Sequence, residues 1–438
     1  MKSKQSYEIT IVLVLLFSSL VAMNSKIYNK VLNQQEIENS EKLKRSGQWI
    51  VSNIHVNNNW TAVNTTYDWC TYKNGYYVIE NVSITGVVGI SGIHIENTTE
   101  NFIVRNCQII EGIKLLRTKG GKIINNTIYF GYPGQWGVSR IGLFMKNCSD
   151  TIIRENYLND TYSGSYRTIY GYLMQQCHNI TIEANFLFTV RNPYDGFFRG
   201  IYLTEDKGNG NSKTINNTIC GFDLGIETTV TKFNQFYNNN LYDCRIGLSI
   251  SGVNQVISNN IIKCGGVRTP GRPHWGVYLG SSNSTLFGNK ISEADWGIGI
   301  YDANDNIINN NSIQNISEHG MYVEGSNFNI IKNNSLQEMR GHGMYILESN
   351  YNNITNNEIQ KAGQIGIYLD TCSYTTINGN YISYNLNCIV EINCHGNIIE
   401  DNSCIHIPSI FGYYPMLIIG ILLMTTIVFI KFKLKKSK

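Results

Sequence analysis

The feature that most constrains this chain is a repeat of 23 residues between Gly320 and Asn385. Its three copies begin GMYVEGSNFNII at Gly320, GMYILESNYNNI at Gly343 and GIYLDTCSYTTI at Gly366. Apolar residues alternate within short runs that Asn, Ser and Gly interrupt, which is typical of strands and not of helices. A fixed period in the low twenties built from such strands indicates a solenoid.

An asparagine column extends this repeat along most of the chain. It comprises thirteen residues, Asn106, Asn126, Asn156, Asn185, Asn217, Asn239, Asn260, Asn289, Asn311, Asn334, Asn357, Asn380 and Asn402. Three residues before nearly every one stands an aliphatic or aromatic residue, with Thr214 as the exception. Asparagine tolerates left-handed backbone, and its amide can bond to the amides above and below it. We therefore predict a polar ladder at a bend, with aliphatic columns facing the core.

Stacked coils explain why the period is so regular. If each coil lies in register on the next, equivalent positions are about 4.8 Å apart and pair by parallel ladder bonds. Connections between parallel strands are overwhelmingly right-handed. We predict an all-β, right-handed parallel β-helix solenoid of about 13 coils over residues 86–407, with an N-terminal cap at 49–85.

Both ends of the chain suggest export and anchoring. Residues 1–25 place Lys2 and Lys4 before an apolar run, which indicates a signal peptide or an N-terminal anchor, and 26–48 read as a polar spacer. Residues 410–430 are almost uncharged and long enough to cross a hydrocarbon core of about 30 Å. The basic tail at 431–438 is expected in the cytoplasm. We therefore expect a cell-membrane protein with a single C-terminal pass and an extracellular β-helix.

The charge balance excludes one class of partner. Charged residues are 15% of the chain and the net charge is only +3, with several lysines in the terminal tails. A nucleic-acid-binding protein would show a basic patch or stripe. We expect a monomer that binds no nucleic acid.

Insertions and aromatic residues mark one sheet as the functional face. Four insertions, at 129–140, 159–170, 188–199 and 264–275, fall at the same corner of their coils and predict a wall beside the glycine-led sheet. The outward column of that sheet is predicted to contain Tyr172, Tyr202, Tyr278, Tyr322, Tyr345 and Tyr368, with Trp136, Trp275 and Trp296 near by. Sugar rings could stack on such a row. The alternative is that tyrosine is simply favourable on a half-exposed strand.

Ionisable residues beside this column raise the alternative of catalysis. Glu318, His342, Asp295 and Asp302 are candidates for acid and base work on a glycosidic bond, as in a lyase, hydrolase or epimerase. The other interpretation is that they are solvated charges at strand ends.

Metal and cysteine chemistry give two further hypotheses. His319 and His342 occupy one column of adjacent coils and could share a metal, for which imidazole would suit copper. No cofactor is predicted beyond this, and Ca or Cu would be the metals to test. Eleven cysteines include the stacked pairs Cys148 with Cys177 and Cys372 with Cys394, which predict either disulfides or unbonded ladders.

The recurrent G-I-Y-L and N-x-I-x-N-N-x-I pattern resembles the right-handed parallel β-helix repeat family, particularly its NosD-like branch, over residues 86–404. NosD-like periplasmic members assist copper-enzyme maturation, so the resemblance implies copper handling as one function. Other members are pectate lyases, polygalacturonases, epimerases, tailspikes and surface proteins. Gly341-His342-Gly343 resembles the Gly-His-Gly motif of polygalacturonases, but the Asn-Thr-Asp and Arg-Ile-Lys motifs are absent.

These observations rank four functions. The first is carbohydrate-polymer binding on the tyrosine-lined sheet, and the second is a polysaccharide lyase, hydrolase or epimerase. A non-enzymatic surface or adhesion protein comes third, and a NosD-like copper-handling protein comes fourth.

Overall fold

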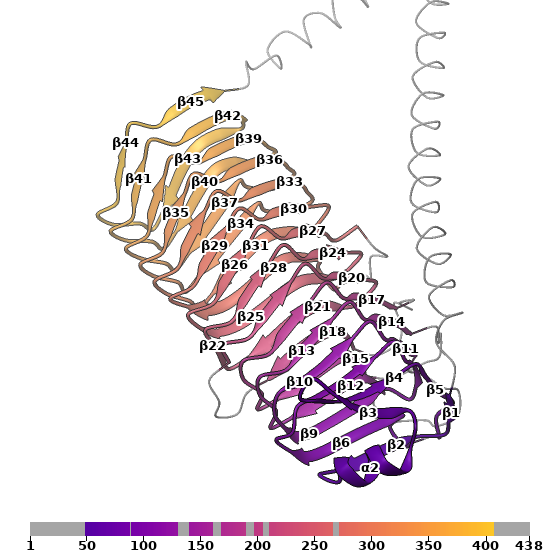
Figure 1. Ribbon diagram of the computed structural model, residues 1–438. Coiled ribbons are helices and arrows are strands. Elements are labelled where there is room, and N and C mark those ends of the chain that lie inside the picture. Colours follow the sequence, from indigo (N-terminus) through magenta and orange to yellow (C-terminus); the bar gives the residue numbers. More distant parts are fainter. Residues whose placement is uncertain are drawn as a thin grey trace, which may run out of the picture.

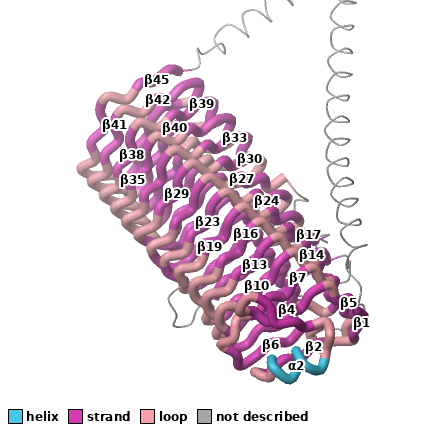
Figure 2. Tube along the Cα trace, viewed as in Figure 1, coloured by secondary structure: helices cyan, strands magenta, loops and turns pink. Residues whose placement is uncertain are grey.

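Short alternating strands separated by turns wind into a rod of stacked coils. The computed structural model describes residues 49–87, 89–129, 140–160, 168–189, 197–204, 210–265 and 271–406. The rod runs from the indigo N-terminal end to the yellow C-terminal end in Figure 1. In Figure 2 the loops between strands line up as continuous corners along the rod. The predicted all-β parallel β-helix is confirmed.

Each coil contributes one strand to each of three sheets, which we number in the order that the chain visits them after a repeat glycine. Sheet 1 contains β2 (Ile54–Asn57), β6 (Ile93–Thr98), β9 (Ile113–Thr118), β12 (Arg140–Lys146), β15 (Ile169–Gln175), β18 (Phe198–Thr204), β21 (Leu224–Thr229), β22 (Thr231–Lys232), β25 (Ile246–Val253), β28 (Trp275–Ser282), β31 (Trp296–Tyr301), β34 (Met321–Glu324), β37 (Met344–Leu347), β40 (Ile365–Asp370) and β43 (Asn387–Ile392).

Sheet 2 leads to the asparagine column and sheet 3 follows it. Sheet 2 contains β3 (Cys70–Lys73), β4 (Tyr76–Glu80), β7 (Phe102–Arg105), β10 (Gly121–Ile124), β13 (Ile152–Arg154), β16 (Thr181–Glu183), β19 (Lys213–Ile215), β23 (Gln235–Tyr237), β26 (Val256–Ser258), β29 (Thr285–Phe287), β32 (Ile307–Asn309), β35 (Ile330–Lys332), β38 (Asn353–Thr355), β41 (Thr376–Asn378) and β44 (Ile398–Glu400).

Sheet 3 contains β1 (Trp49–Val51), β5 (Val82–Ile84), β8 (Gln108–Ile110), β11 (Thr127–Tyr129), β14 (Tyr157–Asp160), β17 (Phe186–Thr189), β20 (Thr218–Cys220), β24 (Asn240–Tyr242), β27 (Ile261–Lys263), β30 (Lys290–Ser292), β33 (Ser312–Ile316), β36 (Ser335–Met339), β39 (Glu358–Ala362), β42 (Tyr381–Asn385) and β45 (Ser403–His406). Strand pairing within the three sheets is parallel apart from the β3–β4 hairpin.

The N-terminal end of the rod is covered by a short helix. Helix α2 (Trp60–Thr66) lies at the indigo end of the rod (Figure 1). Its Trp60 is buried and stacks on Phe102 with ring centroids 5.5 Å apart. The Trp60 indole Nε1–H donates to Thr98 Oγ1 at 3.1 Å. The apolar interior of the first coil is thereby shielded, which also protects the end of the solenoid from edge pairing.

The core is built from columns of identical positions. Ile308, Ile331, Ile354 and Ile377 are all fully buried, and consecutive members pair in register along sheet 2. The repeat glycine marks a bend with no room for a side chain. A Cβ at Gly320 would lie 2.7 Å from the next coil's Gly343 carbonyl oxygen. This close approach explains why glycine begins each copy of the repeat.

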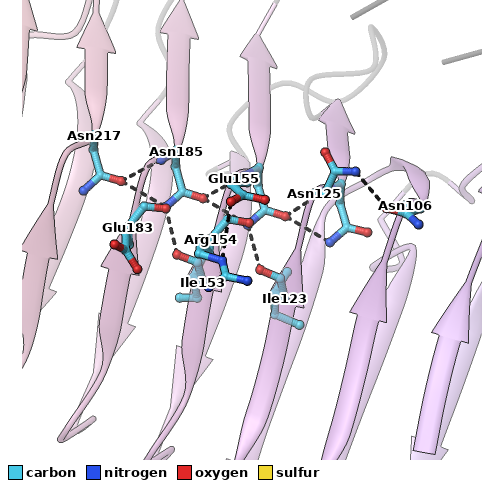
Figure 3. A network of polar contacts seen from close by, with 11 residues as sticks. Asn106, Ile123, Asn125, Ile153, Arg154, Glu155, Glu183, Asn185 and Asn217 are labelled. Atoms are coloured by element: carbon cyan, nitrogen blue, oxygen red, sulfur yellow. Dashed lines mark hydrogen bonds and ion pairs between the residues drawn. The ribbon is translucent and has the colours of Figure 1, made fainter. Parts of the chain in front are cut away.

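A buried amide ladder stands at the corner between sheets 2 and 3. The Asn334 backbone N–H and its Nδ2–H both donate to Oδ1 of Asn357 at 2.9 Å, and Nδ2 also donates to the Ile308 carbonyl at 2.9 Å. The same contacts recur from Asn126 to Asn402, and Figure 3 shows Asn185 and Asn217 within this row. The predicted asparagine ladder is confirmed for these twelve residues.

The first position of the predicted column was wrong by one residue. Val104, not Ile103, pairs with the core residue Ile123, so the ladder position of that coil is Cys107. The Cys107 N–H donates to Oδ1 of Asn126 at 3.0 Å. Asn106 instead belongs to the row of residues that directly precede the ladder positions, which we call the outer row. There its Oδ1 accepts a hydrogen bond from Asn125 Nδ2 (Figure 3).

Left-handed backbone also belongs to this outer row and not to the ladder. Asn333 and Asn356, each just before a ladder asparagine, have φ of 54° and 55°, and Gly379 takes the same place with φ of 66°. The sequence analysis assigned both the left-handed backbone and the amide ladder to one asparagine. In the structure, the residue of the outer row has the left-handed backbone, and the residue after it forms the ladder. This explains why Asn-Asn pairs are frequent in the chain.

A second polar ladder, not predicted from the sequence, follows the corner between sheets 1 and 2. The Asn306 N–H donates to Asn329 Oδ1 at 2.9 Å, and the Asn329 N–H donates to Asn352 Oδ1 at 2.8 Å. All three side chains are buried. Two of the three corners are therefore stabilised by stacked amides.

The eleven cysteines are free thiols. In the predicted Cys372 and Cys394 pair, the Cys372 backbone N–H donates to Cys394 Sγ at 3.4 Å. Cys148 is buried, and its Sγ lies 3.3 Å from Thr118 Oγ1. The unbonded ladder is therefore the alternative that the structure shows.

Several predictions concern residues outside the part of the chain that the structure describes. They are the signal peptide or anchor at 1–25, the spacer at 26–48, the span at 410–430 and the tail at 431–438. Within residues 49–406 as described, the structure contains no helix of the length and apolarity that a bilayer crossing requires.

The ladder geometry predicts the effect of removing one amide. Asn334→Ala leaves the buried Asn311 N–H without its acceptor and removes one donor from the Ile308 carbonyl, which should lower the local free energy of unfolding by about 2–4 kcal/mol. Hydrogen exchange of the flanking coils measures this loss.

Asn333→Gly is the matched control, because glycine already occupies the equivalent left-handed position at Gly379. This variant should change exchange little. Equal losses for the two variants would contradict the assigned roles.

Candidate functional site

Aromatic side chains gather on the outer face of sheet 1 in the C-terminal half of the rod. Nine rings form what we call the aromatic surface: Trp275, Tyr278, Trp296, Tyr301, His319, Tyr322, His342, Tyr345 and Tyr368. They come from β28, β31, β34, β37 and β40 and the residues just before these strands. Trp275 is buried, and the other eight are partly buried.

The rings of the aromatic surface pack against one another. Trp275 stacks on Trp296 with centroids 4.8 Å apart, and Tyr278 stacks on Tyr301 at 4.8 Å. Further along the rod, His342 stacks on Tyr368 at 4.9 Å. The result is a continuous apolar surface crossing five strands.

Gly299 makes this packing possible. It occupies the outward position between Tyr278 and Tyr322. A Cβ there would lie 2.5 Å from Trp275 Cζ3 and 2.8 Å from Tyr301 Cε2. The rings of Trp275 and Tyr301 therefore cover the backbone of β31 at Gly299. Tyr301 was not among the predicted site residues, because its place depends on the gap at Gly299.

The tyrosine column is not the flat platform that the spacing suggested. Tyr322 and Tyr345 are perpendicular, with an interplanar angle of 88°, and Tyr345 and Tyr368 are tilted by 59°. Neighbouring strands lie only about 4.8 Å apart, which is less than the width of a ring lying flat. Adjacent rings must therefore tilt against each other.

The two N-terminal members of the predicted column also differ. Tyr172 pairs with Ile201 on the inner face, is fully buried, and its hydroxyl donates to Asn185 Oδ1 at 3.2 Å. Tyr202 faces outward, but Glu227 and Ser249 separate it from Tyr278. The tyrosine row is therefore continuous only from Tyr322 to Tyr368.

Carboxylates follow the edge of sheet 1 where its strands end. Glu324 pairs in register with Tyr301, and the exposed Asp302 follows Tyr301 directly. Burial, with smaller effects of Asp302 and Glu324, raises the pKa of Tyr278. Burial followed by Glu324 likewise raises the pKa of Tyr322. The phenols stay protonated at neutral pH, so hydroxyl donors and carboxylate acceptors lie side by side.

The four predicted catalytic residues do not converge. Asp295 lies before β31, where it accepts from the His274 N–H at 2.8 Å and from Ser317 Oγ at 2.5 Å. Asp302 lies after the same strand, roughly 20 Å away along seven extended residues. Glu318 is exposed beside His319 at the same edge as Asp295. The sequence analysis placed all four residues beside the tyrosine column. It did not distinguish residues that precede the strands of sheet 1 from residues that follow them.

The predicted metal ligands His319 and His342 are engaged by the backbone. The His342 N–H donates to His319 Nδ1 at 2.8 Å, and the Ile365 N–H donates to His342 Nδ1 at 3.3 Å. The rings stack with centroids 4.9 Å apart. Each ring therefore carries its proton on Nε2 and offers no lone pair to a metal in this arrangement.

The corner between sheets 3 and 1 is hollow beside these histidines. An open pocket of about 440 Å³ is lined by residues that include Ser317, Glu338, Arg340 and Lys361. Two of these lining residues form an ion pair, with Lys361 Nζ 2.8 Å from Glu338 Oε1. The long insertions of other coils fall at this corner, but 130–139, 161–167, 190–196 and 266–270, with Trp136, lie outside the described residues.

A second aromatic row runs along the corner between sheets 1 and 2. Phe328, Tyr351 and Tyr374 are about half exposed, and their rings stack at 5.0 and 5.1 Å with planes within 10° of parallel. The ring faces are used in contacts with each other. This row is more exposed than the aromatic surface, and parallel stacking covers the ring faces within it.

Comparisons with known proteins agree with the fold. A family model described as "Right handed beta helix region" matches residues 275–414. This description agrees with the predicted handedness, while the NosD-like branch stays a prediction. A comparison with curated proteins found no match.

Solved structures are also similar to this chain, to different degrees. A double mutant of the periplasmic alginate epimerase AlgG is 15% identical, with 83% of this chain and 88% of that chain covered and a TM-score of 0.50. The A-module of the Azotobacter vinelandii mannuronan C-5 epimerase AlgE6 is 14% identical, with coverages of 75% and 88% and a TM-score of 0.44. A mannuronic acid specific polysaccharide family 6 lyase from human gut microbiota is 9% identical, with 78% and 84% covered and a TM-score of 0.38.

The partly buried His319 predicts a pH dependence of stability. Burial, followed by the neighbouring His342, lowers the pKa of His319 to about 4, whereas an unfolded histidine titrates near about 6.5. Between these values the unfolded chain binds more protons, so this contribution to stability is present above about pH 6.5 and is lost as the pH falls towards about 4.

His319→Gln should therefore reduce the loss of thermal stability between about pH 7 and about pH 4.5. Unfolding midpoints at the two pH values measure the effect, with the exposed His178→Gln as the control. An unchanged pH dependence in His319→Gln would show that His319 does not cause it.

Proposed function

We propose that the aromatic surface binds a carbohydrate polymer. The observation that carries this proposal is a partly exposed array of rings with hydroxyl donors and carboxylates at its edge. The apolar faces of sugar rings pack on aromatic rings, and their hydroxyls need donors and acceptors near by. Tyr278, Tyr322 and Glu324 supply these groups together.

The shape of the aromatic surface favours an extended ligand. It crosses five neighbouring strands from β28 to β40, which corresponds to about 20 Å along the rod. That length suits several sugar units in a row. The parallel β-helix is also compatible with this ligand class, since the alginate epimerase AlgG has the same fold.

Enzymatic processing is a second candidate, favoured by the position of Glu324. Its carboxylate lies beside Tyr301 and Tyr322, which are phenols protonated at neutral pH, and burial raises their pKa further. A carboxylate base next to a phenolic acid could serve a lyase or an epimerase. The separation of Asp295 from Asp302 argues against the quartet predicted from the sequence.

Two other candidate functions receive less support. Copper handling through His319 and His342 would require their Nδ1 atoms to give up backbone hydrogen bonds. A passive adhesion protein would leave the array at Trp275, Tyr301 and Tyr345 without a ligand. Contiguous apolar surface that stays partly accessible to solvent more commonly marks an interaction site.

The proposal includes the cellular setting. An apolar run at 410–430 followed by five lysines after Ile430 supports a single C-terminal membrane anchor, with the β-helix outside the cell. A tethered rod would present the aromatic surface to polymers at the cell surface. Monomeric behaviour is part of this proposal.

Replacement of tyrosines tests polymer binding. Tyr322→Ala and Tyr345→Ala should each weaken binding by about 1–2 kcal/mol, or roughly five- to thirtyfold, because each removes a ring from the surface. Binding of the purified chain to a polysaccharide panel identifies the ligand, and calorimetry with that polymer measures the loss.

The exposed row at Tyr351 and Tyr374 provides the matched control. The Tyr351→Ala and Tyr374→Ala variants lose the same chemical groups from another corner and should bind as the wild type does. Polymer binding that survives in Tyr322→Ala and Tyr345→Ala would exclude the aromatic surface as its site.

Glu324→Gln separates binding from turnover. If Glu324 is a base, this variant should retain polymer affinity while product formation falls by about 100-fold or more. Chromatography of the polymer after incubation detects cleavage, and NMR detects epimerisation. Wild-type protein that binds polymer but leaves it unchanged would reject the enzymatic alternative.

A further inference from the structure

The N-terminal end of sheet 1 carries a cluster that the aromatic surface does not include. His55 on β2 pairs in register with His94 on β6, and Glu96 lies two residues after His94 on the same outward face. The outward column of the sheet thus begins with two consecutive imidazoles. Their carboxylate neighbour stands beside them on the next outward position.

The three side chains lie within the reach of one ion. One ring nitrogen from each histidine and one oxygen of Glu96 all lie within 4.8 Å of one another. His55 Nε2 is 2.9 Å from Glu96 Oε1, and the two imidazoles stack with centroids 4.7 Å apart. Tetrahedral ligand atoms around Zn²⁺, with bonds of about 2.0–2.1 Å, are about 3.4 Å apart. Small side-chain rotations would bring the three atoms to that separation.

His94 provides a second, independent observation. Its Nε2 is shielded from solvent and finds no hydrogen-bond partner among the described residues. A buried polar atom without a partner is costly, so such atoms in native proteins call for a ligand or an ion.

The surrounding charges restrict the kind of metal. Arg117 Nη2 lies 3.3 Å from Glu96 Oε2, which orients the carboxylate so that Oε1 faces His55. With one carboxylate and two nearby cations, the cluster is poorly suited to Ca²⁺, which takes six to eight oxygen ligands. Two imidazoles and one carboxylate suit Zn²⁺, with a water molecule as the fourth ligand.

We propose that His55, His94 and Glu96 form a Zn²⁺ site that fastens β2 to the first full coil of the β-helix. The site is independent of the aromatic surface and of carbohydrate binding. Because β2 precedes helix α2 and β6 follows it, the ion links the two ends of the segment that covers the rod. Its binding free energy adds to the stability of that end.

Titration of the full chain, stripped of metal with a chelator, tests this proposal. Calorimetry with Zn²⁺ should show one equivalent bound, and the thermal unfolding midpoint should rise with Zn²⁺ concentration. Glu96→Gln and His94→Gln should each weaken binding at least about tenfold. Ca²⁺ should give no comparable shift.

The exposed His178→Gln is the matched control and should bind Zn²⁺ as the wild type does. Co²⁺ spectra exclude the thiols, since the proposed ligands predict d–d bands without thiolate charge transfer. Thiolate bands, no binding by the wild type, or unchanged binding in Glu96→Gln would overturn the site. Should His94→Gln fail to fold, Glu96→Gln and His55→Gln decide the outcome, because His55 is exposed.

Discussion

The in-register stacking of one coil on the next is the constraint on which the rest of this structure depends. Each interior strand pairs with the coils on either side, and the ladder from Asn126 to Asn402 extends the same pairing to side chains. A buried amide is tolerated only because its neighbours satisfy it. The ladder thus fixes the register, and the register determines which residues face inward and which face outward.

The aromatic surface follows from the same stacking. A residue type repeated on the outer face of sheet 1 becomes a row of side chains about one strand spacing apart. Rings in such a row must tilt, as Tyr322 and Tyr345 do, unless a small residue gives them room. Gly299 gives that room, and the rings of Trp275 and Tyr301 occupy it. Packing geometry, and not tyrosine content alone, therefore shapes the proposed binding face.

Sequence periodicity predicted the fold well because each repeat of the sequence corresponds to one coil of the structure. The prediction was wrong where two neighbouring positions both favour the same residue, as at Asn106, where the ladder position falls on Cys107. Tyr172 was misassigned because it directly follows Gly171, in the inward position that Ile201 takes after Gly200, whereas the outward tyrosines stand two residues after their glycines. Tyr301 and the cluster at His94 were missed because they depend on gaps and contacts between coils. No spacing within one coil encodes such contacts.

The amide ladder also has a direction. Each ladder asparagine turns its Oδ1 towards the preceding coil and donates its backbone N–H and one Nδ2–H to the following one, as Asn334 does between Asn311 and Asn357. Any coil therefore meets the same acceptor on one side and the same donors on the other. Tandem duplication of a whole 23-residue unit would preserve every junction, so rods of different lengths are accessible to evolution without redesigning an interface.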